Sequence, residues 1–163
     1  MAIDPGKTLC GVAIFYDRKL VLCTLMHSLI GQGVKAFHTA RMATAPKAAV
    51  YTILETPQHY PRPGPDIDAN DLISIAVTGA WLAGRFTATP PRLVSPGKWK
   101  GNLPKDVCQK RAEGLLEDSE LAAIETGLVD WHPHLHHNAW DAVALGLYGV
   151  KRFKKFAGIT HNG

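Results

Sequence analysis

The hydrophobic pattern along the chain predicts a β-sheet whose strands begin close to the first residue. Apolar and β-branched residues gather in short runs bounded by turn-forming residues, which is typical of strands. Asp17-Arg18 makes a short turn between two of these runs. Thr56-Pro57 ends another, because proline biases the residue before it away from helix. The predicted strands are residues 2–4, 11–16, 19–26, 50–55 and 91–95.

Apolar residues at helical spacing dominate the second half of the chain. Asp68 offers an N-cap, Pro104 suits the first position of a helix, Gly127 is a stop signal, and Asn138 offers a second cap. These signals predict helices over residues 68–85, 104–116, 119–126 and 138–153, with a short helix around residues 40–49. The predicted loops include residues 58–65, 96–102 and 132–137.

The order of these elements predicts an α/β fold, in which helices flank a mixed five-stranded sheet. The last helix must return to the sheet to bury Val143, Leu145 and Leu147. With 163 residues, the chain is long enough for a sizeable core, and we expect a single domain over residues 1–163.

Composition and charge narrow the functional classes. The formal charge of +4 and an isoelectric point near 9.0 are compatible with a nucleic-acid partner but do not demand one. The longest apolar stretch, residues 72–86, is too short and too interrupted to span a bilayer. Cys10, Cys23 and Cys108 show no metal-binding spacing, so we expect buried, reduced thiols and a cytoplasmic protein.

Three carboxylates stand at structurally related places. Asp4 ends the first predicted strand, Glu55 ends the fourth, and Asp141 lies in the first turn of the final predicted helix. Ligands of open α/β sheets gather beyond the carboxyl ends of the strands. Clustered carboxylates stay ionised together when cations lie between them, and their hard oxygen atoms suit Mg²⁺ or Mn²⁺. Two such ions about 3.5–4 Å apart support phosphodiester cleavage.

These carboxylates lie in segments that resemble the RuvC-like Holliday junction endonucleases of the RNase H-like superfamily. The matching segments are Ile3-Asp4-Pro5-Gly6 with Gly11, Ile53-Leu54-Glu55, and residues 140–147. The resemblance implies an RNase H-like mixed five-stranded sheet, a homodimer, and Mg²⁺-dependent nicking of four-way or other branched DNA, with Mn²⁺ able to substitute. It also implies that Asp4, Glu55 and Asp141 are metal-binding catalytic residues.

One position departs from the pattern of this family. The family usually carries an acidic residue or a histidine three positions before the last aspartate, where this chain has Asn138. An asparagine carbonyl ligates a metal but supplies no charge and accepts no proton. His137 is the alternative residue that completes the site. Elsewhere the sequence resembles phage-encoded relatives more than the housekeeping bacterial enzyme.

Basic residues provide candidate contacts to nucleic acid. Basic side chains with an aromatic ring among them suit phosphate contact and base stacking. Two alternatives stay open: Trp99 packs in the core under a solvated loop, and the last basic cluster complements a helix dipole. The candidates are Lys7, Lys98, Trp99, Lys100, Lys105, Lys110, Arg111, Lys151, Arg152, Lys154 and Lys155.

Two further patterns each have two interpretations. Helix 68–85 carries apolar residues on most of its surface, which predicts either a dimer interface or cover by residues 27–47 and 58–65. The histidines at positions 132, 134, 136 and 137 resemble a metal-binding tract, but their spacing favours a polar loop.

The leading hypothesis is a metal-dependent, structure-selective DNA endonuclease. Asp4 before Pro-Gly also fits a plain turn, Glu55 a solvated strand end, and Asp141 a helix first turn favoured by the dipole. Alternative functions are a YqgF-like RNA-processing nuclease and a junction-binding protein that has lost catalysis. An ATP-binding domain of the actin and sugar-kinase type needs two domains, which 163 residues do not supply.

Overall fold

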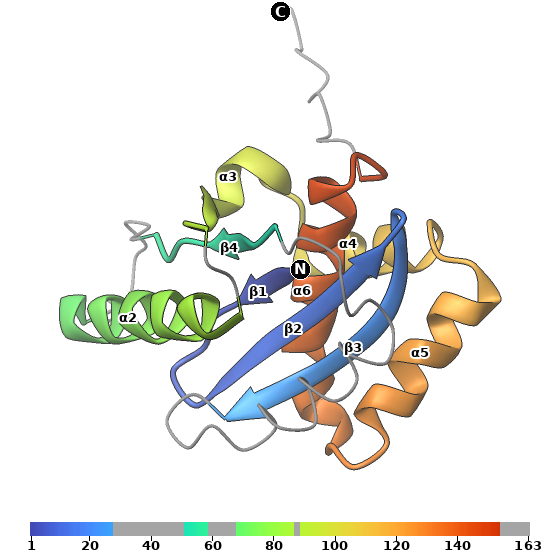
Figure 1. Cartoon of the computed structure of the whole chain (residues 1–163), viewed down its shortest axis with the longest axis horizontal. Helices are drawn as coiled ribbons and strands as arrows, with labels where there is room; N and C mark the ends of the chain where they lie inside the picture. The colour runs from blue at the N-terminus through green and yellow to red at the C-terminus, as the bar shows by residue number, and fades with distance from the viewer. Residues whose placement is uncertain (28–50, 59–67, 87–88, 154–163) are drawn as a thin grey trace, which may run out of the picture.

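A five-stranded mixed sheet forms the centre of the computed structural model, which describes residues 1–27, 51–58, 68–86 and 89–153. Its order is β3-β2-β1-β4-β5 (Figure 1). The first three strands pair antiparallel, whereas β1, β4 and β5 run parallel to one another. The strands are β1 (Ala2–Asp4), β2 (Leu9–Tyr16), β3 (Lys19–His27), β4 (Ile53–Glu55) and β5 (Arg92–Val94).

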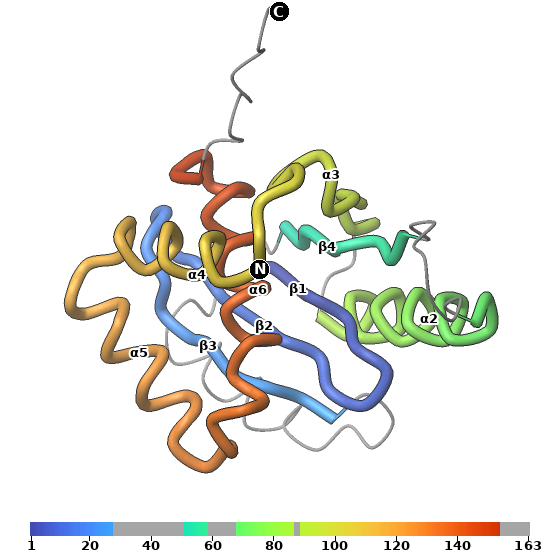
Figure 2. The backbone as a smooth tube through the Cα atoms, turned by 180° about the vertical axis from the view of Figure 1, so that it is seen from behind, coloured from blue at the N-terminus to red at the C-terminus, as the bar shows by residue number. Residues whose placement is uncertain are grey.

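Helices cover both faces of this sheet. Seen from behind, α6 crosses the strands with α4 and α5 beside it (Figure 2), while α2 packs on the opposite face against β1 and β4. The helices are α2 (Ala69–Phe86), α3 (Pro96–Trp99), α4 (Lys105–Glu113), α5 (Asp118–Leu128) and α6 (His136–Gly149), with a 3₁₀ turn, η1 (Pro133–Leu135). The predicted α/β fold with a mixed five-stranded sheet is confirmed.

The alternation of side chains along the strands divides the core into two clusters. Ala2 and Ile53 pack with α4, α5 and α6, whereas Ile3 and Leu54 pack with α2. This is the period of two that a pleated strand imposes. The predicted return of the last helix is confirmed, because Val143, Leu145 and Leu147 are fully buried against the sheet; the three cysteines are buried thiols, also as predicted.

The hairpin between β2 and β3 turns tightly at the predicted position. Asp17 and Arg18 have φ values of 46° and 66°, so both central residues adopt the left-handed conformation. This is the backbone of a type I′ turn, whose twist matches that of the flanking strands.

Several predicted boundaries are wrong, and tertiary packing explains the clearest of them. Gly127 lies inside α5 instead of ending it, because a Cβ atom there would clash with the backbone of Cys23 in β3. Asn138 does not cap the last helix, which begins two residues earlier, so Asp141 lies in its second turn. Residues 96–102, predicted as a loop, include the one-turn helix α3.

The remaining boundaries differ by a few residues, as element ends commonly do. The fourth strand begins at Ile53, α4 ends at Glu113, and α6 ends at Gly149. The predicted helix around residues 40–49 and almost all of the loop at 58–65 lie outside the described residues. None of the helices in the described part of the chain has the length and apolar character that crossing a bilayer requires.

Candidate functional site

Two of the three predicted carboxylates come from neighbouring parallel strands. Ala2 pairs with Ile53 and Ile3 with Leu54, so the same register places Asp4 opposite Glu55. Asp4 shares the strand face of Ala2, and Glu55 shares that of Ile53, which is the face that α6 covers. The two carboxylates therefore end adjacent strands on the same side of the sheet.

The third carboxylate arrives on α6, which approaches the sheet closely. Gly11 pairs with Asp4 across β1 and β2, and a side chain there would clash with the Asn138 carbonyl. Gly146 makes room in the same way for the ring of Phe15. This packing places Asp141, which is only 8% exposed, in the helix turn that follows Asn138.

Glu55 is held by two side chains from the segment that follows β5. The indole Nε1 of Trp99 donates a hydrogen bond of 2.6 Å to Glu55 Oε2. The ammonium group of Lys100 lies 3.8 Å from the same oxygen and 4.9 Å from the centre of the Trp99 ring. The short helix α3 positions both donors, so Glu55 is oriented through one of its two oxygen atoms.

Asp141 pairs with a lysine at the start of α4. Lys105 Nζ lies 3.1 Å from Asp141 Oδ2, and the two side chains are 54% and 11% exposed respectively. The pair therefore joins a solvated lysine to a carboxylate that the fold has almost removed from water.

The three carboxylates interact electrostatically. Burial raises the pKa of Asp4 well above its usual value, and the negative charges of Glu55 and Asp141 raise it further. Burial also raises the pKa of Glu55, although Lys100 and the Trp99 hydrogen bond oppose this shift. Such mutual perturbation in a cleft is typical of a functional site.

Lys100 belongs to the same electrostatic system. Burial alone would lower its pKa, but Glu55, Asp141 and Asp4 outweigh that effect, so the pKa is raised. The lysine is therefore a firmly held positive charge beside three acidic groups.

A cavity of about 760 Å³ opens beside these groups. Asp4 does not line it, but the next residue, Pro5, does. Its walls also include Leu72 and Ile75 from α2, and the charged side chains of Glu55, Lys100, Lys105 and Asp141. A cavity of this volume, with both signs of charge in its wall, is large enough for a nucleotide-sized group.

Within the described residues, neither of the two residues proposed to complete the carboxylate set forms a side-chain hydrogen bond or ion pair with Asp4, Glu55 or Asp141. The backbone of Asn138 packs against Gly11, opposite Asp4 in the β1–β2 register, so the residue lies near the site. His137 is exposed, and its Nδ1 lies 2.8 Å from the carbonyl oxygen of His134. The His137 ring therefore contacts the 3₁₀ turn η1 that precedes it in the chain.

Two of the predicted nucleic-acid contacts are structural instead. Trp99 is fully buried and its N–H bonds Glu55, so its ring offers no surface for base stacking. Arg152 is occupied by Glu120, with bonds of 2.6 and 2.8 Å, and by the carbonyl groups of Arg18 and Leu115. For Trp99, the alternative of a core position is the correct one.

The other basic residues are distributed over the β1–β2 turn, α3, α4 and the end of α6. Lys7 pairs with Asp71 of α2 at 2.7 Å, and the guanidinium of Arg111 lies over the Phe153 ring. Lys98, Lys110 and Lys151 are exposed, whereas Lys154 and Lys155 lie outside the described residues.

The arrangement of donors for a metal ion is incomplete in the described residues. There, no group of three His, Cys, Asp or Glu side chains is arranged to hold a metal ion. His132 and His134 approach to 2.5 Å between their Nδ1 atoms, but they are exposed and form a pair only. Around the carboxylates, the lysine ammonium groups provide the nearest positive charge.

The ion pairs of Lys100 and Lys105 with these carboxylates were not predicted from the sequence. Both lysines were expected to contact nucleic acid, and no spacing signal pairs them with Glu55 or Asp141, which lie 45 and 36 positions away.

Known family models and curated protein sequences give no match to this chain.

Proposed function

We propose that this protein is a metal-dependent, structure-selective endonuclease that resolves four-way or other branched DNA by paired phosphodiester nicks. One observation carries the proposal: Asp4, Glu55 and Asp141 approach one another from β1, β4 and α6, beside a cavity with lysines in its wall. The strand order, with β1 between an antiparallel and a parallel neighbour, is the order expected of an RNase H-like fold of RuvC type.

The donor chemistry of this site fits a hard divalent cation. Asp4, Glu55 and Asp141 offer carboxylate oxygens, the atoms that Mg²⁺ and Mn²⁺ prefer. Glu55 keeps Oε1 available because Trp99 and Lys100 contact Oε2. A cation between these groups would relieve the repulsion that raises the pKa of Asp4. Asn138 would add a neutral oxygen.

The protein itself contributes binding and orientation. When bound, Mg²⁺ or Mn²⁺ supplies Lewis acidity for water activation and for the departing oxygen. Trp99 fixes the orientation of Glu55, and the lysines in the cavity wall attract the phosphate backbone. The products would carry 5′-phosphate and 3′-hydroxyl ends.

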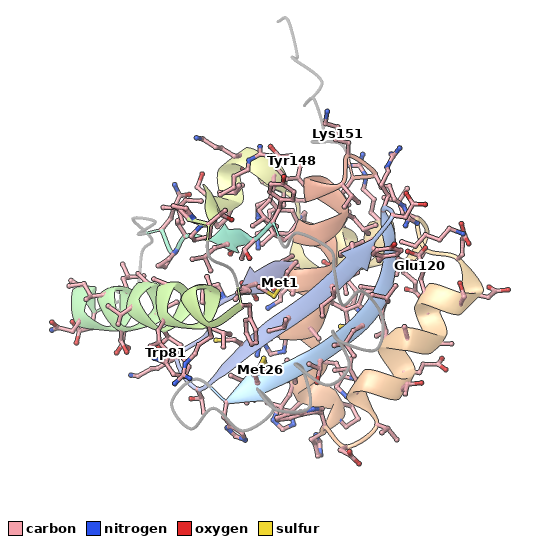
Figure 3. All side chains as sticks on the ribbon, viewed as in Figure 1. Met1, Met26, Trp81, Glu120, Tyr148 and Lys151 are labelled. Carbon is pink, nitrogen blue, oxygen red and sulfur yellow. The ribbon has the colours of Figure 1, made fainter. Side chains whose placement is uncertain are left out.

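A homodimer is the assembly we propose for this activity. Ile73, Val77 and Trp81 recur every four residues on α2 and are 61%, 62% and 40% exposed. Trp81 lies at the outer margin of the molecule (Figure 3). A two-fold dimer through this helix would present two equivalent sites to a four-way junction.

The decisive experiment is cleavage of a labelled synthetic four-way junction beside a matched linear duplex, in Mg²⁺, Mn²⁺ or EDTA. We expect paired, metal-dependent nicks near the branch point and none in the duplex. Asp4→Asn should abolish nicking and preserve junction binding, whereas Asp130→Asn, which changes an exposed aspartate, is the matched control.

Each alternative function predicts a different result in this assay. Tight junction binding without cleavage in either metal would identify a junction-binding protein, with Asn138 marking the lost activity. Cleavage of structured RNA with no cleavage of the junction would identify an RNA-processing nuclease of YqgF type. Full activity of Asp4→Asn would refute the assignment of the site.

A further inference from the structure

We propose that Lys105 and Lys100 are counter-cations that hold the carboxylates of the site together, and that Lys105 is displaced when a divalent cation binds. This inference rests on the proposed function in taking a divalent cation as the ligand. It adds a competition between that ligand and a side chain of the protein.

The positions of the two ammonium groups carry the first step. Lys105 Nζ lies 3.1 Å from Asp141 Oδ2, and Lys100 Nζ lies 3.8 Å from Glu55 Oε2. Both lysines also lie within electrostatic reach of Asp4. Three acidic groups on three elements, with Asp141 buried and Asp4 and Glu55 partly buried, thus have two positive charges beside them. Buried charges are retained in proteins when they are paired in this way.

The two lysines differ in how firmly the fold holds them. The Lys100 side chain is 22% exposed, and its ammonium group also lies 4.9 Å from the centre of the buried Trp99 ring. The Lys105 side chain is 54% exposed and begins α4, with Asp141 as its ion-pair partner. Lys105 can therefore move into solvent without breaking a packed contact, whereas Lys100 cannot.

A divalent cation and Lys105 compete for the same oxygen atoms. A divalent cation that ligates the Asp141 carboxylate would lie close to the ammonium group of Lys105, which is 3.1 Å from Oδ2. Like charges at such short separation repel strongly when they are partly shielded from water. Binding of the cation must therefore break the ion pair between Lys105 and Asp141. The free energy of that ion pair is subtracted from the favourable free energy of metal binding.

The test is calorimetric titration of Mn²⁺ into the DNA-free protein, comparing Lys105→Met with Lys98→Met. Lys98 is exposed on α3 and forms no ion pair with a described carboxylate, so its variant controls for net charge. We expect Lys105→Met to bind Mn²⁺ about fivefold more tightly than the control, the upper end for an exposed ion pair. Equal or weaker binding would overturn the proposal.

A second measurement addresses the metal-free state. In EDTA, Lys105→Met should unfold at a lower temperature than Lys98→Met because the carboxylates have lost a counter-charge, and Mn²⁺ should remove this difference. Equal unfolding temperatures in EDTA would overturn the counter-cation role.

Asp4→Asn separates this proposal from the proposed function. If the native protein binds Mn²⁺, Asp4→Asn does not, and Lys105→Met matches its control, only the inference about Lys105 fails. If the native protein binds no Mn²⁺, both the metal site and the displacement fail together.

Discussion

The ion pair between Glu120 and Arg152 makes a quantitative prediction about stability. Glu120 lies where α5 passes the β2–β3 hairpin (Figure 3) and is 1% exposed. It accepts hydrogen bonds from the two terminal guanidinium nitrogens of Arg152 and from the backbone N–H groups of Leu20 and Glu117. One carboxylate thereby connects α5, β3 and the segment after α6.

Replacing Glu120 with glutamine removes the negative charge and leaves Arg152 with its backbone carbonyl partners but without its counter-charge. Removing one member of a buried ion pair costs about 3 kcal/mol or more, because the remaining charge, here a guanidinium only 18% exposed, loses its counter-charge. For a domain of this size, about 1 kcal/mol lowers the melting temperature by roughly 2–4 °C. We therefore expect Glu120→Gln to melt about 6–12 °C below the native protein at pH 7.

The same pair predicts a pH dependence. Its hydrogen bonds to Arg152 and to the backbone outweigh burial and lower the pKa of Glu120 from 4.5 to about 2. A carboxylate with a lowered folded-state pKa stabilises the protein fully above the unfolded value of 4.5, and this stabilisation disappears as the pH falls toward 2. The difference in melting temperature between the native protein and Glu120→Gln should therefore narrow as the pH falls from 4.5 toward 2.

Thermal unfolding followed by far-ultraviolet circular dichroism at pH 7, 4 and 2.5 measures both effects. Lys19→Met is the matched control, because Lys19 forms an exposed ion pair with Glu117 beside the same hairpin and should shift the melting temperature far less. Equal melting temperatures for Glu120→Gln and the native protein at pH 7 would refute the structural role. A difference that stays constant with pH would refute the charge as its cause.

Three further substitutions test the packing and the site. Gly127→Ala should destabilise the fold by about 1–3 kcal/mol in urea unfolding, because its Cβ meets the β3 backbone, whereas Gly84→Ala, with open space around it, should not. Trp99→Phe keeps a buried aromatic ring but removes the hydrogen bond to Glu55, so the free energy of unfolding should fall by about 1 kcal/mol. Mn²⁺ binding by this variant should also weaken in calorimetry. Asp4→Asn should raise the melting temperature in EDTA at pH 7, because it removes an acid whose pKa burial raises in the folded protein. That gain should vanish below pH 3.8, where Asp4 is neutral in both the folded and the unfolded protein, and a gain that persists there would contradict the reasoning.

Local signals in the sequence were sufficient for most of the fold. The apolar runs of β1 to β3, the turn at Asp17 and Arg18, and the long helix α2 all depend on near neighbours along the chain. They were predicted correctly because side-chain periodicity and turn conformation are local properties. The fourth strand was predicted with its carboxylate end in the correct place and its start too early.

Two residues whose roles depend on packing against the sheet, Gly127 and Asn138, were predicted wrongly. Gly127 carries the usual signature of a helix end, but its role is to let α5 approach β3. Asn138 likewise has the chemistry of a cap and lies in the first turn of α6, against Gly11. Glycine and asparagine serve either at a helix end or at a close packing contact, and tertiary contacts decide between these roles. The sequence alone does not reveal which role applies.

The sequence alone identified Asp4, Glu55 and Asp141 as a candidate set, because acidic residues at strand ends and early in a helix are visible in the chain order. Only the tertiary structure decided how they are neutralised. Parallel pairing of β1 with β4 and the close approach of α6 bring the acids within electrostatic reach, and the segment after β5 brings Lys100, Lys105 and the Trp99 indole to them. The physical reason is range: side-chain patterns report on neighbours along the chain, whereas charge pairing depends on distances that folding alone creates.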